Sequence, residues 1–388
     1  MIMDSVNKIL IVVSFALLCA CSTETSNDTR PNILFIVADD LGFTDLGAFG
    51  SEIPTPNIDE LAFQGVRLTN FHTSYTCQAT RVMMMASTGV SGALELRPPM
   101  ASRERANRLS LNWAILPELL QEAGYETYMT GKWDLGLEDG YTPATRGFDR
   151  SFVQVGASAS YFAEVLWGNY SLYELDGERV EYEALPDDFY ATNYYTDKMI
   201  EFIKANEGVA PWFAYVPYTA PHWPLQVPEE SLSRFAGSYD AGYDALREER
   251  VARAGELGVI PGGATLVDFT SLAPRWDELT DEQQQRYART QELYAAMVEN
   301  LDINVGRLID LLRTSGQLEN TVIVFTSDHG ASTAEFGHTA GLVPWQGGPI
   351  VPDFIDNRFD NWGRQNSFVD HGLGFGEAAS APLEGAKG

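Results

Sequence analysis

The sequence predicts an α/β protein built on a large mixed, mostly parallel sheet flanked by helices. Apolar runs recur along the chain with helical patterns between them, which is the alternation that such a sheet requires. Residues 32–38 form a continuous apolar run of the kind that fills a parallel strand covered on both faces. Because open α/β sheets bind ligands outside the carboxyl ends of their strands, ionisable residues at several strand ends predict one site assembled from distant segments.

Four apolar runs are predicted as strands, and each leads into candidate site residues. They cover residues 32–38, 127–130, 212–218 and 321–326. The ionisable residues that follow them are, in chain order, Asp39 and Asp40, Lys132 and Asp134, His222, and Asp328 and His329.

Helices are predicted between these strands at residues 57–65, 116–124 and 283–315. The first has Asn57 as a cap and Gly65 as a stop, and the second repeats that form. The third carries apolar residues at helical spacing, which is more typical of a core than of a site. The segments 229–264 and 343–387 are charged or glycine-rich and aperiodic, so we expect surface excursions around one domain.

The composition constrains the partners of the chain. Its 388 residues include 26 Lys and Arg against 54 Asp and Glu, a net charge of −28. A nucleic-acid surface needs clustered cations, so this balance argues against one. With 45% hydrophobic residues, a substantial core can form. An acidic surface repels anions, so any chemistry on an anionic substrate must depend on local cations or a metal.

The first 30 residues resemble an export signal. An apolar run at residues 9–18 follows Lys8 and is too short to span a membrane. The stretch 18–21, which contains Cys19 and Cys21, resembles the bacterial lipobox, in which the last cysteine is acylated. We therefore expect a lipoprotein signal peptide at residues 1–20, a polar linker at 21–30 and one folded domain at 31–388. The protein would be exported and lipid-anchored at Cys21, in the periplasm or at the cell surface.

Three carboxylates at two strand ends are candidate metal ligands. Asp39 and Asp40 alone are more typical of a solvated turn. Together with Asp328 they offer hard oxygen atoms, which suit Ca²⁺ or Mg²⁺ better than zinc. The chain has only five histidines, too few for an imidazole-rich zinc pair.

Two further pairs remain open between a structural and a chemical role. Lys132 and Asp134 leave one face of an extended segment and form either a buried ion pair or an anion clamp beside a base. Cys77 stands four residues before Arg81, ahead of an apolar run at 82–85. At a helix N-terminus both the arginine and the helix dipole favour a nearby anion. The thiol of Cys77 is either a buried apolar group or chemically employed.

Taken together, these motifs resemble the sulfatase family of the alkaline phosphatase-like superfamily, specifically formylglycine-dependent bacterial arylsulfatases. The resemblance covers residues 30 to about 380. It rests on PNIL at 31–34 with the aspartate pair, CQATR at 77–81, GKW at 131–133, RGF at 146–148, APHWP at 220–224, residues 294–308, and SDHG at 327–330.

The resemblance implies a reaction and a role for each site residue. Cys77 would be oxidised to formylglycine, whose hydrate attacks the sulfate sulfur and leaves a sulfated intermediate that collapses by elimination. Arg81 would orient the hydrate, Lys132 would bind sulfate or leaving-group oxygen, and His222 would protonate or position the leaving oxygen. Asp134 would stand where the family has a histidine base. Ca²⁺, in preference to Mg²⁺, would be held by Asp39, Asp40, Cys77, Asp328 and His329.

Three departures from the family pattern stand out. Ala79 replaces the usual proline of the modification motif, a form read by radical-type maturation enzymes. Asp134 replaces histidine, and two unit charges about 4 Å apart repel by roughly 4 kcal/mol at an effective dielectric near 20. The chain stops at Gly388, so we expect the family's small C-terminal antiparallel subdomain to be largely absent. Lys387 lies near the place of a further family lysine, but the residues around it do not support that match.

These features predict a hydrolase of sulfate esters, with a sulfated small molecule or glycan as substrate and a formylglycine-generating or radical maturation enzyme as partner. Two alternatives stay open. One is an inactive sulfatase-like protein that binds sulfated glycans, and the other is a phosphonate or phosphodiester hydrolase of the same superfamily.

Overall fold

The structure, a computed structural model, describes residues 30–89, 93–95, 108–164, 172–208, 210–261, 273–334, 355–383 and Lys387. The chain divides into two compact units, Met1–Arg30 and Pro31–Gly388, and only the second is described below. The predicted signal peptide and residues 21–29 of the predicted linker, with Cys19 and Cys21, lie outside the described residues. Within the described part of the chain, no helix has the length and apolar character needed to cross a membrane.

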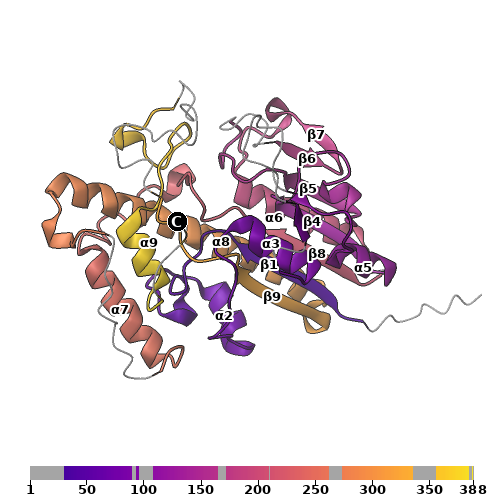
Figure 1. The fold of residues 1–388 in the computed structure, drawn as a ribbon, viewed down its shortest axis with the longest axis horizontal. Coiled ribbons are helices and arrows are strands. Elements are labelled where there is room, and N and C mark those ends of the chain that lie inside the picture. The colour runs from indigo at the N-terminus through magenta and orange to yellow at the C-terminus, as the bar shows by residue number, and fades with distance from the viewer. Residues whose placement is uncertain are drawn as a thin grey trace, which may run out of the picture. The chain divides into compact units, whose positions relative to one another are not determined.

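Seven strands of the described chain form one sheet in the order β7-β6-β5-β4-β8-β1-β9 (Figure 1). They are β1 (Asn32–Ala38), β4 (Glu126–Lys132), β5 (Arg150–Gln154), β6 (Tyr173–Leu175), β7 (Glu178–Val180), β8 (Trp212–Pro217) and β9 (Thr321–Ser327). Strands β5, β4, β8, β1 and β9 run parallel, whereas β6 pairs antiparallel with β5 on one side and with β7 on the other. This arrangement confirms the predicted mixed, mostly parallel sheet. A separate antiparallel pair joins β2 (Leu94–Glu95) and β3 (Arg108–Leu109).

The described helices begin and end close to the predicted positions where a prediction was made. They are α2 (Pro56–Gln64), α3 (Cys77–Ala86), α5 (Leu116–Glu122), α6 (Ala191–Ala205), α7 (Gly242–Glu256), α8 (Asp281–Thr314) and α9 (Leu373–Ser380). Helix α8 starts with a capping box between Thr280 and Gln283, which satisfies free backbone N–H groups of its first turn. Short 3₁₀ turns occur at Gly47–Phe49, Pro143–Thr145, Tyr182–Ala184, Glu229–Ser231, Trp276–Glu278, Leu318–Asn320 and Phe359–Asn361.

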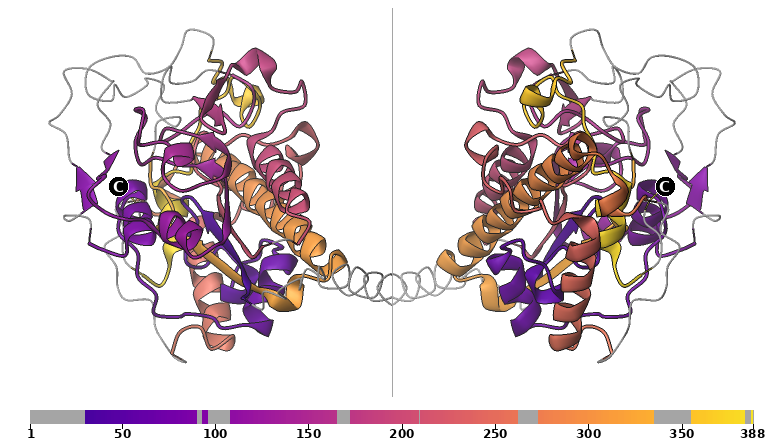
Figure 2. Two further views of the ribbon diagram at one scale, coloured as in Figure 1. Left: turned by 90° about the vertical axis from the view of Figure 1, so that its right-hand side faces the viewer. Right: turned by 90° about the vertical axis from the view of Figure 1, so that its left-hand side faces the viewer.

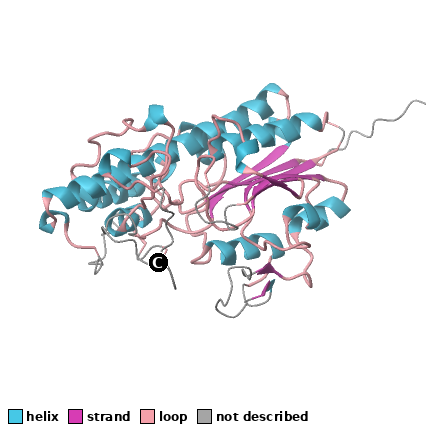
Figure 3. Ribbon diagram, turned by 90° about the horizontal axis from the view of Figure 1, so that it is seen from above, coloured by secondary structure: helices cyan, strands magenta, loops and turns pink. Residues whose placement is uncertain are grey.

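Helices cover both faces of the sheet (Figure 3). On one face Leu34 and Ile36 of β1 pack into a core with α6 and α8. On the other face Val37 of β1 packs into a core with α3 and the start of α5. Figure 2 shows the long helix α8, in orange, running obliquely across its side of the sheet. Successive side chains of β1 point to opposite faces, and both faces are covered, so the strand is apolar throughout.

Two helices lie in segments that were expected to be surface excursions, and that expectation is wrong for them. Helix α7 forms within 229–264, and its buried residues Tyr243, Leu246 and Arg250 recur at helical spacing. Helix α9 forms within 343–387 and is buried along most of its length. The two helices pack together beside α8 (Figure 1). A buried arginine breaks the apolar pattern of α7, and glycines break that of α9.

Candidate active site

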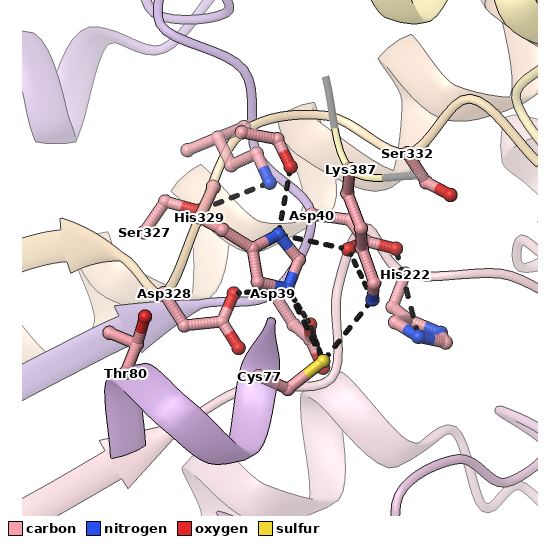
Figure 4. Close-up of polar contacts among 12 residues, drawn as sticks. Asp39, Asp40, Cys77, Thr80, His222, Ser327, Asp328, His329, Ser332 and Lys387 are labelled. Carbon is pink, nitrogen blue, oxygen red and sulfur yellow. Dashed lines mark hydrogen bonds and ion pairs between the residues drawn. The ribbon is translucent and has the colours of Figure 1, made fainter. Parts of the chain in front are cut away.

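Side chains from the ends of β1, β8 and β9 and from the start of α3 meet at one edge of the sheet (Figure 4). Lys132 at the end of β4 reaches the same place, where it contacts Asp39. Strands β4, β8, β1 and β9 are neighbours and run parallel, so their carboxyl ends lie side by side. The structure brings together there the residues named from the sequence: Asp39, Asp40, Cys77, Arg81, Lys132, Asp134, His222, Asp328 and His329.

The aspartate pair follows the central strand β1 directly. The backbone N–H of Asp39 donates to the carbonyl oxygen of Ala220, 3.1 Å away, which ties this turn to the end of β8. Asp40 adopts a left-handed backbone with φ of 66°. Burial would raise the pKa of Asp39, but the charge of Lys132, aided by other cations, holds it well below its usual range. Both side chains are buried, so two carboxylates stand at the centre of the site.

Cys77 is the first residue of α3 and lies at the centre of a polar cluster. Its Sγ atom is 3.2 Å from Nε2 of His329 and 3.7 Å from Oδ1 of Asp39. Thr76 precedes it in an extended conformation and begins the helix. The sulfur therefore sits at a helix N-terminus, where the helix dipole favours negative charge.

Arg81 lies one helical turn beyond Cys77 and is fully buried. Its Nε and Nη2 atoms donate to Oδ2 of Asp328 at 3.2 and 3.0 Å. Its Nη1 atom donates to the backbone carbonyl oxygen of Lys132 at 3.0 Å. The arginine thus links α3 to the ends of β4 and β9.

Lys132, the last residue of β4, pairs with Asp39 and not with Asp134. Its Nζ atom is 2.5 Å from Oδ2 of Asp39. Gly131 before it has φ of +126°, and a Cβ there would lie 2.0 Å from the carbonyl oxygen of Pro217, so this close strand contact needs glycine. Asp134 turns away in a left-handed conformation and accepts a hydrogen bond from Gln78 at 3.2 Å. Burial raises the pKa of Asp134.

The two histidines of the site have opposite protonation behaviour. Burial lowers the pKa of His222 to about 4, and its Nδ1 atom donates to the carbonyl oxygen of Trp223, 2.6 Å away. Its Nε2 atom then carries the lone pair, 3.7 Å from Oδ2 of Asp40. Burial would also lower the pKa of His329, but nearby carboxylates, Asp328 above all, raise it to about 10.

Lys387 also lies in the site, although the residues around it in the sequence did not indicate this. Its Nζ atom lies 2.9 Å from Oδ1 of Asp40 and 3.2 Å from Sγ of Cys77. Its backbone pairs with the segment after β9: its N–H donates to the carbonyl oxygen of Ala331, and its own carbonyl oxygen accepts from Thr333. The interpretation that Lys387 does not match a site lysine is therefore wrong, because its ammonium group lies in the site. The only sequence feature that could have indicated this role is its position after the other site motifs, because the residues next to it do not form a recognisable motif.

The donor set fits a hard divalent cation. Oδ2 of Asp40 and Oδ1 of Asp328 are buried without a hydrogen-bond partner among the described residues, which is costly unless a cation satisfies them. Ligand atoms of Asp39, Cys77, Asp328 and His329 lie within 4.8 Å of one another. Three carboxylates offer the oxygen ligands that Ca²⁺ and Mg²⁺ prefer.

Comparisons with known proteins agree on one family. Residues 31–361 match the family model described as Sulfatase. An uncharacterized sulfatase of Schizosaccharomyces pombe is 40% identical over 384 residues, which cover 92% of this chain and 67% of that protein. An arylsulfatase of Klebsiella aerogenes is 35% identical over 386 residues, covering 97% of this chain and 81% of that protein.

The fold has solved counterparts. The crystal structure of Ps i-CgsB matches with a TM-score of 0.58 and 25% identity, covering 82% of this chain and 62% of that one. The chain therefore spans less than two thirds of the length of this solved structure.

Proposed function

The chain belongs to the sulfatase family, and on that premise we propose that it hydrolyses sulfate esters through a formylglycine made from Cys77, with Ca²⁺ in the site. Its sheet and helices have the alkaline phosphatase-like fold of that family. The observation that carries the proposal is the position of Cys77 Sγ at the start of α3, within 3.7 Å of Asp39, His329 and Lys387. A hydrated aldehyde at position 77 would supply the hydroxyl that attacks sulfur.

Asp39, Asp40, Asp328 and His329 would hold the cation, with residue 77 completing the set. Oδ2 of Asp40 and Oδ1 of Asp328, which are buried without a hydrogen-bond partner among the described residues, and the closeness of the ligand atoms of Asp39, Asp328 and His329 support this assignment. A divalent cation there would offset negative charge on the sulfate as it transfers. Ca²⁺ is proposed ahead of Mg²⁺ because it accepts more ligands and a less regular geometry.

The cations of the site would bind the sulfate group and orient it for attack. Lys132 at the end of β4 contacts Asp39, and Lys387, which is distant in sequence, contacts Asp40. Arg81 is held by Asp328 and the Lys132 carbonyl, so its guanidinium is fixed before substrate enters. These local positive charges would offset the long-range repulsion of an anionic substrate that a net charge of −28 predicts.

His222 would position the leaving oxygen. Its Nδ1–H is committed to the Trp223 carbonyl, which fixes the ring and points Nε2 toward Asp40 and the site. In the neutral ring Nε2 accepts, so it would hold the hydroxyl of the departing alcohol, whereas donation to the ester oxygen itself would first require a proton on Nε2.

A sulfated small molecule or glycan is the proposed substrate class. An N-acetylglucosamine-6-O-sulfatase of Bacteroides thetaiotaomicron is 26% identical over 85% of this chain, which supports a glycan among the candidates. We also propose that a formylglycine-generating or radical enzyme matures Cys77, and that the protein is exported and lipid-anchored at Cys21. Loss of membrane association in Cys21→Ala tests the anchor.

One observation favours the second candidate, an inactive sulfatase-like protein that binds sulfated glycans. Asp134, buried beside Gln78, the neighbour of Cys77, stands where the family has a histidine base, and its carboxylate would also repel a sulfate during transfer. The repulsion depends on ionisation, and burial raises the pKa of Asp134, which lessens it at low pH.

Parallel assays test the function directly. The full chain, produced with a maturation enzyme, is assayed on an aryl sulfate, an aryl phosphonate monoester and a phosphodiester, with Cys77→Ala as control. We expect sulfate hydrolysis that Cys77→Ala abolishes. Faster phosphonate or diester cleavage would assign the other hydrolase class, and binding of sulfated glycans without any turnover by matured protein would assign the inactive alternative.

A further inference from the structure

The backbone of the turn that carries Asp40 is hydrogen-bonded by residues that do not contact the cation-binding atoms. Asp40 has a left-handed backbone, which is uncommon for residues other than glycine. Its backbone carbonyl oxygen lies 2.9 Å from the hydroxyl of Tyr294 on α8. The carboxylate faces the opposite contacts, Lys387 and His329. Tyr294 thus restrains the peptide unit that sets the direction of a proposed calcium ligand.

Asp45 joins this tyrosine to the same turn. Its Oδ2 atom accepts a hydrogen bond from the backbone N–H of Gly42 at 2.7 Å and lies 2.7 Å from the Tyr294 hydroxyl. The side chain is fully buried. One carboxylate therefore fixes both the chain just after Asp40 and the tyrosine that contacts Asp40.

Arg250 on α7 neutralises Asp45. Its Nη1 atom lies 2.5 Å from Oδ1 of Asp45, and both side chains are fully buried. Its Nε and Nη2 atoms each lie 2.8 Å from an oxygen of Glu52, which holds the guanidinium as a fork. Without the arginine, Asp45 would be a buried carboxylate with no counter-charge, and the turn would rearrange to expose it.

We propose that Tyr294, Asp45 and Arg250 are positioning residues that hold Asp40 in its left-handed conformation and so set the affinity of the site for Ca²⁺. The inference rests on the proposed function, because it takes the cation to be bound by Asp40. It gives helix α7 a part in the site although no residue of that helix contacts the candidate ligands. Residues that orient metal ligands without touching the ion typically contribute 10- to 100-fold to metal affinity.

Calcium titration of the purified full chain by isothermal calorimetry tests the inference. Tyr294→Phe removes one hydroxyl from the relay, and Tyr218→Phe is the matched control, because its buried hydroxyl lies 2.7 Å from Thr196 on α6 instead. We expect Tyr294→Phe to raise the Kd for Ca²⁺ about tenfold or more. Tyr218→Phe should keep the Kd within about twofold of the unsubstituted chain, by the same comparison.

A second pair of variants tests the far end of the relay. Arg250→Met should weaken Ca²⁺ binding, and Arg250→Lys, which keeps the charge beside Asp45, should restore part of it. If Arg250→Met does not fold, Arg250→Lys and Tyr294→Phe decide the matter. Equal Kd values for Tyr294→Phe, Tyr218→Phe and the unsubstituted chain would overturn the inference while leaving the proposed function standing. Failure of the unsubstituted chain to bind Ca²⁺ would overturn both.

Discussion

The Nζ atom of Lys387 lies 3.2 Å from Sγ of Cys77, although 310 positions separate the two residues in the chain. The same Nζ atom is 2.9 Å from Asp40, and the lysine side chain is only 19% exposed. A segment near the end of the chain therefore places a cation beside the proposed nucleophile. The site is thus assembled from segments that lie far apart in the chain.

Substitution of Lys387 should impair turnover without unfolding the protein. A hydrogen bond to a charged group contributes roughly 1.5–3 kcal/mol, so Lys387→Ala should lower kcat/KM for an aryl sulfate by about 10- to 100-fold. Lys198→Ala, in which a lysine paired with Glu201 outside the site is removed, serves as control. If the two variants have equal kcat/KM, Lys387 does not bind the substrate or the transition state.

Asp134 should make the activity fall with rising pH. Burial raises its pKa, so the neutral acid persists above the usual aspartate range, and the carboxylate that repels sulfate forms as the pH rises through that raised pKa. The ratio of kcat/KM for Asp134→Asn to that of the unsubstituted chain should therefore increase with pH and then level. Asp134→His should raise the activity near neutral pH.

A pH series of kcat/KM checks this, with Asp139→Asn as an exposed control. A ratio that does not change with pH would refute the repulsion. Inactivity of Asp134→Asn at every pH would instead assign the carboxylate as a base.

Removal of the cation should cost both activity and stability. Oδ2 of Asp40 and Oδ1 of Asp328 are buried without a hydrogen-bond partner among the described residues, and a bound cation would satisfy both. Chelation should abolish turnover, Ca²⁺ should restore it better than Mg²⁺, and Ca²⁺ at 100 times its Kd should stabilise the fold by about 2.7 kcal/mol. Thermal unfolding with and without Ca²⁺ measures this. An identical Tm in the two conditions would contradict a bound cation.

The Glu52–Arg250 pair should make the fold sensitive to acid. Burial would raise the pKa of Glu52, but Arg250 lowers it from the ordinary 4.5 to about 2. A carboxyl whose folded pKa is depressed stabilises the fold above its unfolded pKa, and that contribution is lost as the pH falls from about 4.5 to 2. A shift of this size corresponds to about 3 kcal/mol.

Urea unfolding of the unsubstituted chain and of Glu52→Gln across this range measures the contribution. The difference between their free energies of unfolding should shrink as the pH falls. A difference that stays constant would show that the pair does not contribute in the proposed way.

The sequence predicted the elements whose apolar pattern is uninterrupted. Strands β1, β4, β8 and β9 and helix α8 lie close to the predicted bounds because burial on one or both faces leaves a regular pattern. Helix α7 was missed because Arg250 occupies a core position, where its charge is neutralised by two residues about 200 positions away. Only the tertiary structure brings those partners together.

The candidate site was largely predictable because strand ends concentrate ionisable residues at one edge of a sheet. Two details were not. The choice of Asp39 over Asp134 as the partner of Lys132 depends on the left-handed turn at Asp134, which leads its side chain to Gln78. The position of Lys387 depends on backbone pairing with the segment after β9, which no local pattern encodes.

The mass of the proteolytic peptide that contains Cys77 tests the central claim most directly. The full chain is produced with and without a formylglycine-generating or radical maturation enzyme, and the two peptides are compared by mass spectrometry. The account predicts that maturation converts the thiol to an aldehyde, visible as the corresponding loss of mass, and that aryl sulfate turnover rises in proportion to the converted fraction. A Cys77 thiol that stays wholly unmodified in a protein that still hydrolyses the sulfate ester would contradict it.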